Sequence, residues 1–92
     1  MSSVASFAKA FLLLAKQPDI GNGAKLVTAE FRLAEFLKLA GPASADQLAK
    51  LEELDTELHS MIARNSAEAS FLLEVLAFVC VKKQHLEDAM AG

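Results

Sequence analysis

The sequence contains few of the residues that build most catalytic and ligand-binding sites. Its 92 residues include one cysteine, two histidines, four glycines and no tyrosine or tryptophan. The single cysteine, Cys80, excludes a disulfide framework within the chain and is consistent with a reducing compartment. Because its neighbours are apolar, we expect Cys80 to be a buried, unreactive side chain. With no glycine-rich phosphate loop and no cluster of metal ligands, the sequence predicts no catalytic residue, no metal site and no cofactor.

The sequence also lacks an excess of positive charge and any long hydrophobic run. Nine lysines and arginines against twelve acidic residues give a formal net charge of −3, which offers little attraction for a nucleic-acid backbone. The two most apolar stretches, 4–15 and 71–81, contain Lys9 and Glu74 and are shorter than the roughly 20 apolar residues of a membrane-spanning helix. The start of the chain has no signal-peptide pattern. We therefore expect a cytoplasmic protein that does not enter a membrane.

Hydrophobic residues, in contrast, are abundant. They make up 53% of the chain, and the mean hydropathy is +0.31. We expect one small helical domain over residues 1–92, of a size that buries roughly 60–65% of the surface of its unfolded chain. The surplus of hydrophobic residues indicates either a very full core or apolar surface that a partner covers.

Apolar periodicity and the turn residues between the periodic segments predict helices over about 3–17, 24–40, 45–64 and 67–89. Ser2 or Ser3 is the expected cap of the first helix. The stretch 18–23 is rich in Pro, Gly and Asn and predicts a loop. Gly41 and Pro42 are expected to end the second helix, with Gly41 in a left-handed conformation.

Ser44 and Gln47 fit a capping box at the start of the third helix, and Asn65 to Glu68 fits a second capping pattern before the fourth. Neither Gly nor Pro enforces the break at Asn65 and Ser66, so one long fused helix is the alternative there. No alternating strand pattern competes. The sequence therefore predicts an all-α, compact four-helix bundle-like domain, whose short connections make most neighbours antiparallel.

The fourth helix contains the most distinctive segment, in which ten of the eleven residues of 71–81 are apolar. At 100° per residue these side chains point in all directions around the helix, so other protein must surround it. Three covering helices are barely enough, which favours a homodimer formed through the fourth helix. The candidate interface residues are Phe71, Val75, Phe78 and Val79.

Two further helix faces are candidates for contacts. On the second helix, Val27, Phe31 and Ala34 form an apolar stripe beside the main one, so this helix is expected to touch two neighbours. The polar face of the third helix is either simply solvated or an acidic docking face for a basic partner; its candidate residues are Glu52, Glu53, Asp55 and Glu57.

His59 lies midway along the third helix, an arrangement similar to that of histidine phosphotransfer domains, where an exposed imidazole accepts a phosphoryl group. That family places a Lys three residues after the histidine with a Gly next to it, whereas this chain has Ile62 and Ala63 there. Asp55 and His59, four residues apart, are only two potential metal ligands and do not make a site.

The segment 32–51 resembles the first two helices of winged-helix regulators. In that family a turn and a basic recognition helix come next, but here 52–57 continues the helical pattern with carboxylates that DNA phosphates would repel. The sequence as a whole predicts a non-catalytic protein–protein interaction module, such as a small adaptor, regulator or inhibitor. A helix-turn-helix-like DNA-binding regulator is the alternative, followed by a phosphotransfer domain that uses His59.

Overall fold

The computed structural model describes residues 3–41 and 44–91. They form four α-helices and one 3₁₀ turn, with no strand in either stretch: α1 (Ser3–Ala15), α2 (Asn22–Leu39), α3 (Ser44–Arg64), η1 (Ser66–Glu68) and α4 (Ala69–Ala91). The predicted all-α class is confirmed, and each α-helix ends within two residues of its expected position. The expected cap at Ser2 and the stop at Pro42 lie outside the described residues.

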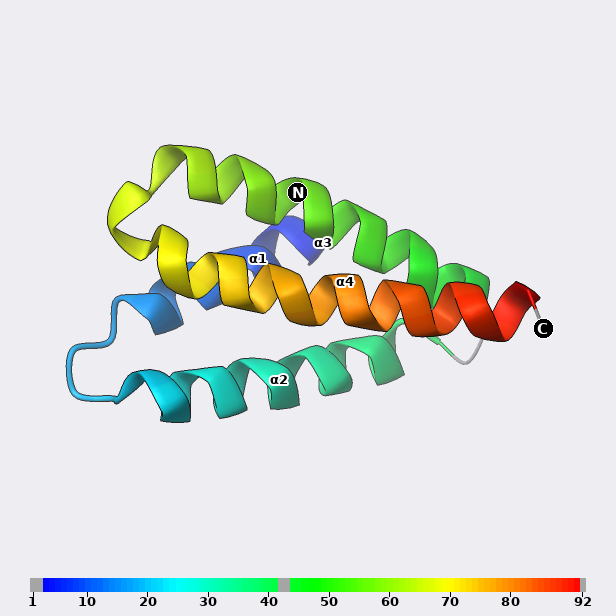
Figure 1. Ribbon diagram of the computed structural model, residues 1–92, viewed down its shortest axis with the longest axis horizontal. Helices are drawn as coiled ribbons and strands as arrows, with labels where there is room; N and C mark the ends of the chain where they lie inside the picture. The colour runs from blue at the N-terminus through cyan, green and yellow to red at the C-terminus, as the bar shows by residue number, and fades with distance from the viewer. Residues whose placement is uncertain (1–2, 42–43, 92) are drawn as a thin grey trace.

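The four helices lie along one long axis, with α1 and α3 running one way and α2 and α4 the other (Figure 1). In this view α4 lies between α2 and α3, and α1 lies behind them. The expected antiparallel packing holds for α3 with α4, which make the most extensive contact of the fold. However, α1 also packs on α3, and α2 on α4, as parallel neighbours. The central, strongly apolar α4 contacts all three other helices.

One hydrophobic core joins the four helices. α1, α3 and α4 each place four or five residues fully inside it, whereas α2 contributes only Ala29 and Leu33. The α2 residues Leu26, Phe36 and Leu37 are half-buried against the same core. α2 is therefore the helix with the fewest fully buried residues in the core.

α4 has a buried side and an exposed side, so the chain's own helices do not surround its apolar segment completely. Its core-facing side includes Leu72 and Leu76, while Leu73, Ala77 and Val81 are exposed on the opposite side. Cys80 lies on this outer side and is exposed, so the expected burial of its thiol is wrong. The reason is geometric, because the neighbouring helices cover the inner part of the α4 circumference and leave the outer part to solvent.

The chain breaks between α3 and α4, which excludes the fused helix. Asn65 has non-helical backbone angles (φ −133°, ψ 69°), and η1 follows it. The Asn65 side chain donates from Nδ2 to the carbonyl oxygen of Met61 at 2.8 Å and makes no cap bond to the next helix. The amide therefore closes the end of α3, in place of the expected cap on the fourth helix.

The C-terminal ends of α1 and α2 are closed in a similar way. Lys25 Nζ donates to the carbonyl oxygen of Ala15 at 2.8 Å. Gln47 Nε2 donates to the carbonyl oxygens of Leu37 and Gly41 at 3.1 and 3.0 Å. Gly41 has the predicted left-handed conformation, with φ 108°. In place of the capping box expected for α3, the Gln47 amide thus donates to one carbonyl in the last turn of α2 and to one just after it.

Candidate functional site

The four predicted interface residues of α4 belong mostly to the core of their own chain. Phe71, Val75 and Val79 are 7%, 1% and 0% exposed, and Phe78 is half-buried against the same core. A charged substitution at Val75 would therefore disrupt the fold before it could report on a dimer. The apolar surface that a partner can reach lies elsewhere.

The four acidic residues predicted as a docking face do not share one face. Glu52 and Glu53 are exposed, but Asp55 and Glu57 lie on opposite flanks of α3. Asp55 turns towards α4, while Glu57 lines a groove beside α1. The predicted acidic face is thus split between solvent and two neighbouring helices.

Asp55 is the centre of a polar cluster that links α3 to α4. Lys83 Nζ donates to its Oδ2 at 3.0 Å, and His59 Nδ1 lies 2.7 Å from its Oδ1 and 2.9 Å from its backbone oxygen. The hydrogen bond to Asp55 raises the pKa of Lys83, with the negative charge of Asp55 adding to the effect. Within 3–41 and 44–91, no group of three or more His, Cys, Asp or Glu side chains is arranged to hold a metal. The cluster therefore acts as an inter-helix ion pair, with an exposed imidazole at its edge.

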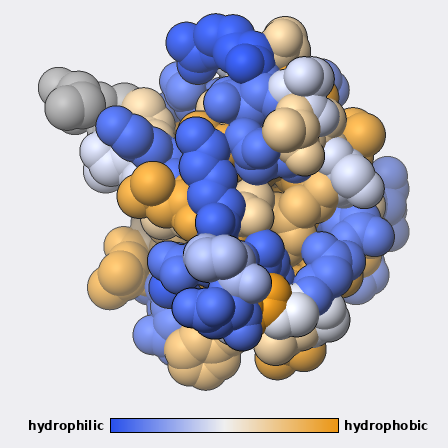
Figure 2. Space-filling view, turned by 90° about the vertical axis from the view of Figure 1, so that its left-hand side faces the viewer, coloured by the Kyte–Doolittle hydropathy of each residue, from blue (hydrophilic) through white to orange (hydrophobic). Residues whose placement is uncertain are grey.

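The most exposed apolar helix face is on α2. Val27 and Phe31 are 70% and 66% exposed, and Ala24 and Ala34 are exposed on the same side. We call these four residues the α2 stripe. It points away from Ala29 and Leu33, the two core residues of the helix. Seen along the long axis, hydrophobic side chains reach the lower edge of the molecule, where α2 lies (Figure 2).

The sequence identified Val27, Phe31 and Ala34 as a second apolar stripe, and α2 does touch two neighbours, but neither of them covers this stripe. α2 packs on α4 and, more sparsely, on α1, and both lie on its inner side. The contact with α1 includes a stacked pair of rings, Phe7 and Phe36, whose centroids are 4.2 Å apart. The outer side of α2 remains open. This uncovered apolar stripe is therefore a candidate contact surface.

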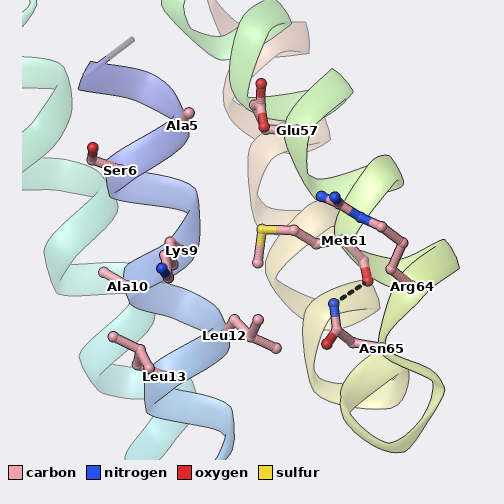
Figure 3. Close-up of a pocket in the computed structure, with 10 residues that line it drawn as sticks. All are labelled: Ala5, Ser6, Lys9, Ala10, Leu12, Leu13, Glu57, Met61, Arg64 and Asn65. Atoms are coloured by element: carbon pink, nitrogen blue, oxygen red, sulfur yellow. Dashed lines mark hydrogen bonds between the residues drawn. The ribbon is translucent and has the colours of Figure 1, made fainter. Parts of the chain in front are cut away.

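A groove of about 720 Å³ runs between α1 and α3, and we call it the α1–α3 groove (Figure 3). It is lined by Ala5, Ser6, Lys9, Ala10, Leu12, Leu13, Glu57, Met61, Arg64 and Asn65. Leu12 and Met61 point into the space between the two helices from opposite sides. A smaller hollow of about 380 Å³ lies between α1 and α2 and shares Ala10 and Leu13 with the groove.

The segment 32–51, which resembles two helices of winged-helix regulators, spans the second half of α2 and the first turns of α3. α3 continues without a break from Ser44 to Arg64, so no turn follows Leu51. The residues after it, including Glu52 and Glu53, extend the same helix and are exposed. This geometry does not provide the separate third helix that the resemblance requires.

The chain matches no protein-family model, and comparisons with curated proteins and with solved structures gave no match. None of the helices in the described part of the chain has the length and hydropathy needed to cross a membrane. The candidate sites therefore stand on their own geometry. They are the α2 stripe, the α1–α3 groove and the polar cluster around Asp55.

Proposed function

We propose that this protein is a non-catalytic, helical protein–protein interaction module of the cytoplasm, a small adaptor, regulator or inhibitor that works as a homodimer. Val27 and Phe31 support this function most directly, because two large apolar side chains lie side by side on the outside of α2. Covering them with a second copy removes apolar surface from water. We place the contact on α2 and not on the predicted face of α4, because the chain's own core already covers Val75 and Val79.

A second copy suits the α2 stripe because its pattern is symmetric. Ala24, Val27, Phe31 and Ala34 are separated by three, four and three residues, with the small side chains outside and the large ones inside. Two such helices packed antiparallel about a twofold axis bring Val27 of one copy against Phe31 of the other. The same register brings Ala24 against Ala34. Isologous dimers require this kind of self-complementary surface.

One charge beside the stripe agrees with this register, that of Glu35, which also lies 3.7 Å from Lys38 in its own chain. Glu35 of one copy comes beside the start of the second copy's α2, near Asn22, where the positive end of the helix dipole favours a carboxylate. A single helix pair is small beside the roughly 1,600 Å² of a standard interface. We therefore expect a reversible dimer with a dissociation constant on the order of micromolar.

Size-exclusion chromatography with light scattering over a range of concentrations tests the dimer. The unmodified protein should show a mass that rises with concentration towards that of two chains. Phe31→Ser should weaken the dimer by at least about tenfold, because a large central apolar side chain dominates such a contact. The matched control is Leu73→Ser, which removes another exposed apolar side chain, on the outer side of α4.

Circular dichroism should show that both variants remain folded, since neither side chain is part of the core. The proposed contact is wrong if the unmodified protein stays monomeric at high micromolar concentration. It is equally wrong if Leu73→Ser reduces the mass as much as Phe31→Ser does.

A further inference from the structure

We infer that the α1–α3 groove is a docking site for an amphipathic helix of another protein, one whose apolar face is flanked by carboxylates. The groove shares no residue with the α2 stripe, so the inference goes beyond the proposed dimer. Together the two surfaces would let one copy bind both its twin and a different protein.

The shape and lining of the groove favour a helix as the occupant. Its volume of about 720 Å³ is open along two neighbouring helices. Half-buried Leu12 and almost fully buried Met61 line the space between the helices, and the small side chain of Ala5 leaves room on the α1 side. Leu13, 56% exposed, extends this surface at the groove's edge. Such grooves hold the apolar face of a helix by side chains spaced three or four residues apart.

The charges of the groove specify the chemistry of that helix. Lys9 lies on the α1 wall and Arg64 on the α3 wall (Figure 3). Neither makes an ion pair within 3–41 and 44–91, and Arg64 only donates from Nε to the backbone oxygen of Ser60 at 3.3 Å. A cation on each wall can engage carboxylates on both flanks of a bound helix.

The groove has one acidic lining residue, Glu57, which lies towards the Ala5 end (Figure 3). The lining therefore carries two cations and one anion, a local positive balance on a chain of formal net charge −3. α1 itself contains no acidic residue. A helix with carboxylates near Lys9 and Arg64 is attracted to this surface, while a basic helix is repelled by the same two residues.

Two synthetic peptides serve as probes, each labelled with fluorescein and about 14 residues long, which is about four helical turns. Both carry leucines at i, i+4, i+7 and i+11, and they differ only in having glutamates or lysines beside that stripe. Fluorescence anisotropy with the full chain measures their affinities. We expect the glutamate peptide to bind at least about tenfold more tightly than the lysine peptide.

Variants of exposed residues locate the binding without disturbing the core. Lys9→Glu and Arg64→Glu should each lower the affinity for the glutamate peptide by about fivefold or more. Each should also reduce the difference in affinity between the glutamate and lysine peptides. Leu13→Ser should also lower the affinity for the glutamate peptide, because part of the apolar contact is lost. Lys82→Glu on α4 makes the same charge change away from the groove, and Leu73→Ser is the control for Leu13→Ser; neither should shift the affinity by more than about twofold.

The groove is not this docking site if neither peptide binds, or if Lys82→Glu acts like Lys9→Glu, which would indicate general charge attraction. Light scattering on the groove variants supplies a further check. A loss of dimer in Lys9→Glu or Leu13→Ser would mean that a second copy fills the groove, and would overturn the inference. If the protein is monomeric but still binds the glutamate peptide through Lys9, the α2 dimer is refuted and the docking site in the groove is supported.

Discussion

At the residue scale, Asp55 and Lys83 form the one ion pair between helices in the described chain. Their side chains are 20% and 24% exposed, so water screens this pair less than it screens a free surface pair. Asp55 comes from the polar side of α3, where the sequence predicted a face for an external partner. Lys83, in the second half of α4, pairs with Asp55 within the chain, so this carboxylate is already engaged.

The ion pair predicts a pH-dependent contribution to stability. Lys83→Met should lower the free energy of unfolding by about 1 kcal/mol at neutral pH, the upper end for a surface pair. Because the folded state raises the pKa of Lys83, this contribution is complete below the unfolded pKa of about 10.4 and disappears as pH rises through the folded value. Urea unfolding at neutral and strongly alkaline pH checks this, with the exposed Lys82→Met as control. A difference from the unmodified protein that stayed constant into strong alkali would contradict the assignment.

At the scale of the helix, three C-terminal ends are closed by side chains that come from outside the helix. Lys25 serves α1, Gln47 serves α2 and Asn65 serves α3. Local sequence patterns predicted Gln47 and Asn65 as parts of N-terminal caps, because the same polar residues suit both roles. The choice depends on which orphan carbonyls the fold brings near, and a sequence pattern alone does not contain that information.

Gln47 and Ser44 distinguish the two capping schemes. We expect Gln47→Ala to lower the free energy of unfolding by about 1 kcal/mol, because its part-buried amide satisfies two carbonyls of the α2 end. Ser44→Ala should cost clearly less, since Ser44 already lies inside α3. Chemical denaturation of both variants provides the comparison. If Ser44→Ala lowers the free energy of unfolding more than Gln47→Ala does, the capping box is the correct interpretation.

At the scale of the whole molecule, α1, α3 and α4 share most of the core, and α2 lies at its edge. Only Ala29 and Leu33 of α2 are fully buried. The same helix carries Val27 and Phe31 on its outer side, where we place the contact with a second copy. Dimer formation would thus bury the outer side of the helix that has the fewest buried residues within its own chain.

Hydrogen exchange should report both the small share of α2 in the core and the proposed contact on its outer side. In dilute protein, α2 amides should exchange faster than those of α3 and α4, because a helix with little buried apolar surface opens at lower free energy. At high concentration the α2 amides should become better protected, since dimerisation stabilises the folded helix by mass action. Mass spectrometry at two concentrations measures this, with Phe31→Ser as the variant in which the concentration dependence should vanish. Equal protection of α2 and α4 in dilute protein would contradict this picture.

Much of the fold could be predicted from the sequence, but less of the candidate sites could be. The helices and the stop at Gly41 follow from short-range periodicity and turn chemistry. The α2 stripe was also visible, as Val27, Phe31 and Ala34. The α1–α3 groove was not, because it joins residues such as Lys9 and Arg64 that are far apart in the sequence. No local pattern relates the two.

The sequence by itself determined four helices, their approximate ends and the surplus of apolar side chains, because backbone propensity and helical periodicity act over a few residues. Only the tertiary structure decided where that surplus is exposed. Phe71 and Val75 were equal in hydrophobic character to Phe31 and Val27, yet packing buried the first pair and left the second in solvent. A helical wheel gives the direction of each side chain, but which directions meet another helix depends on how all four helices share one core.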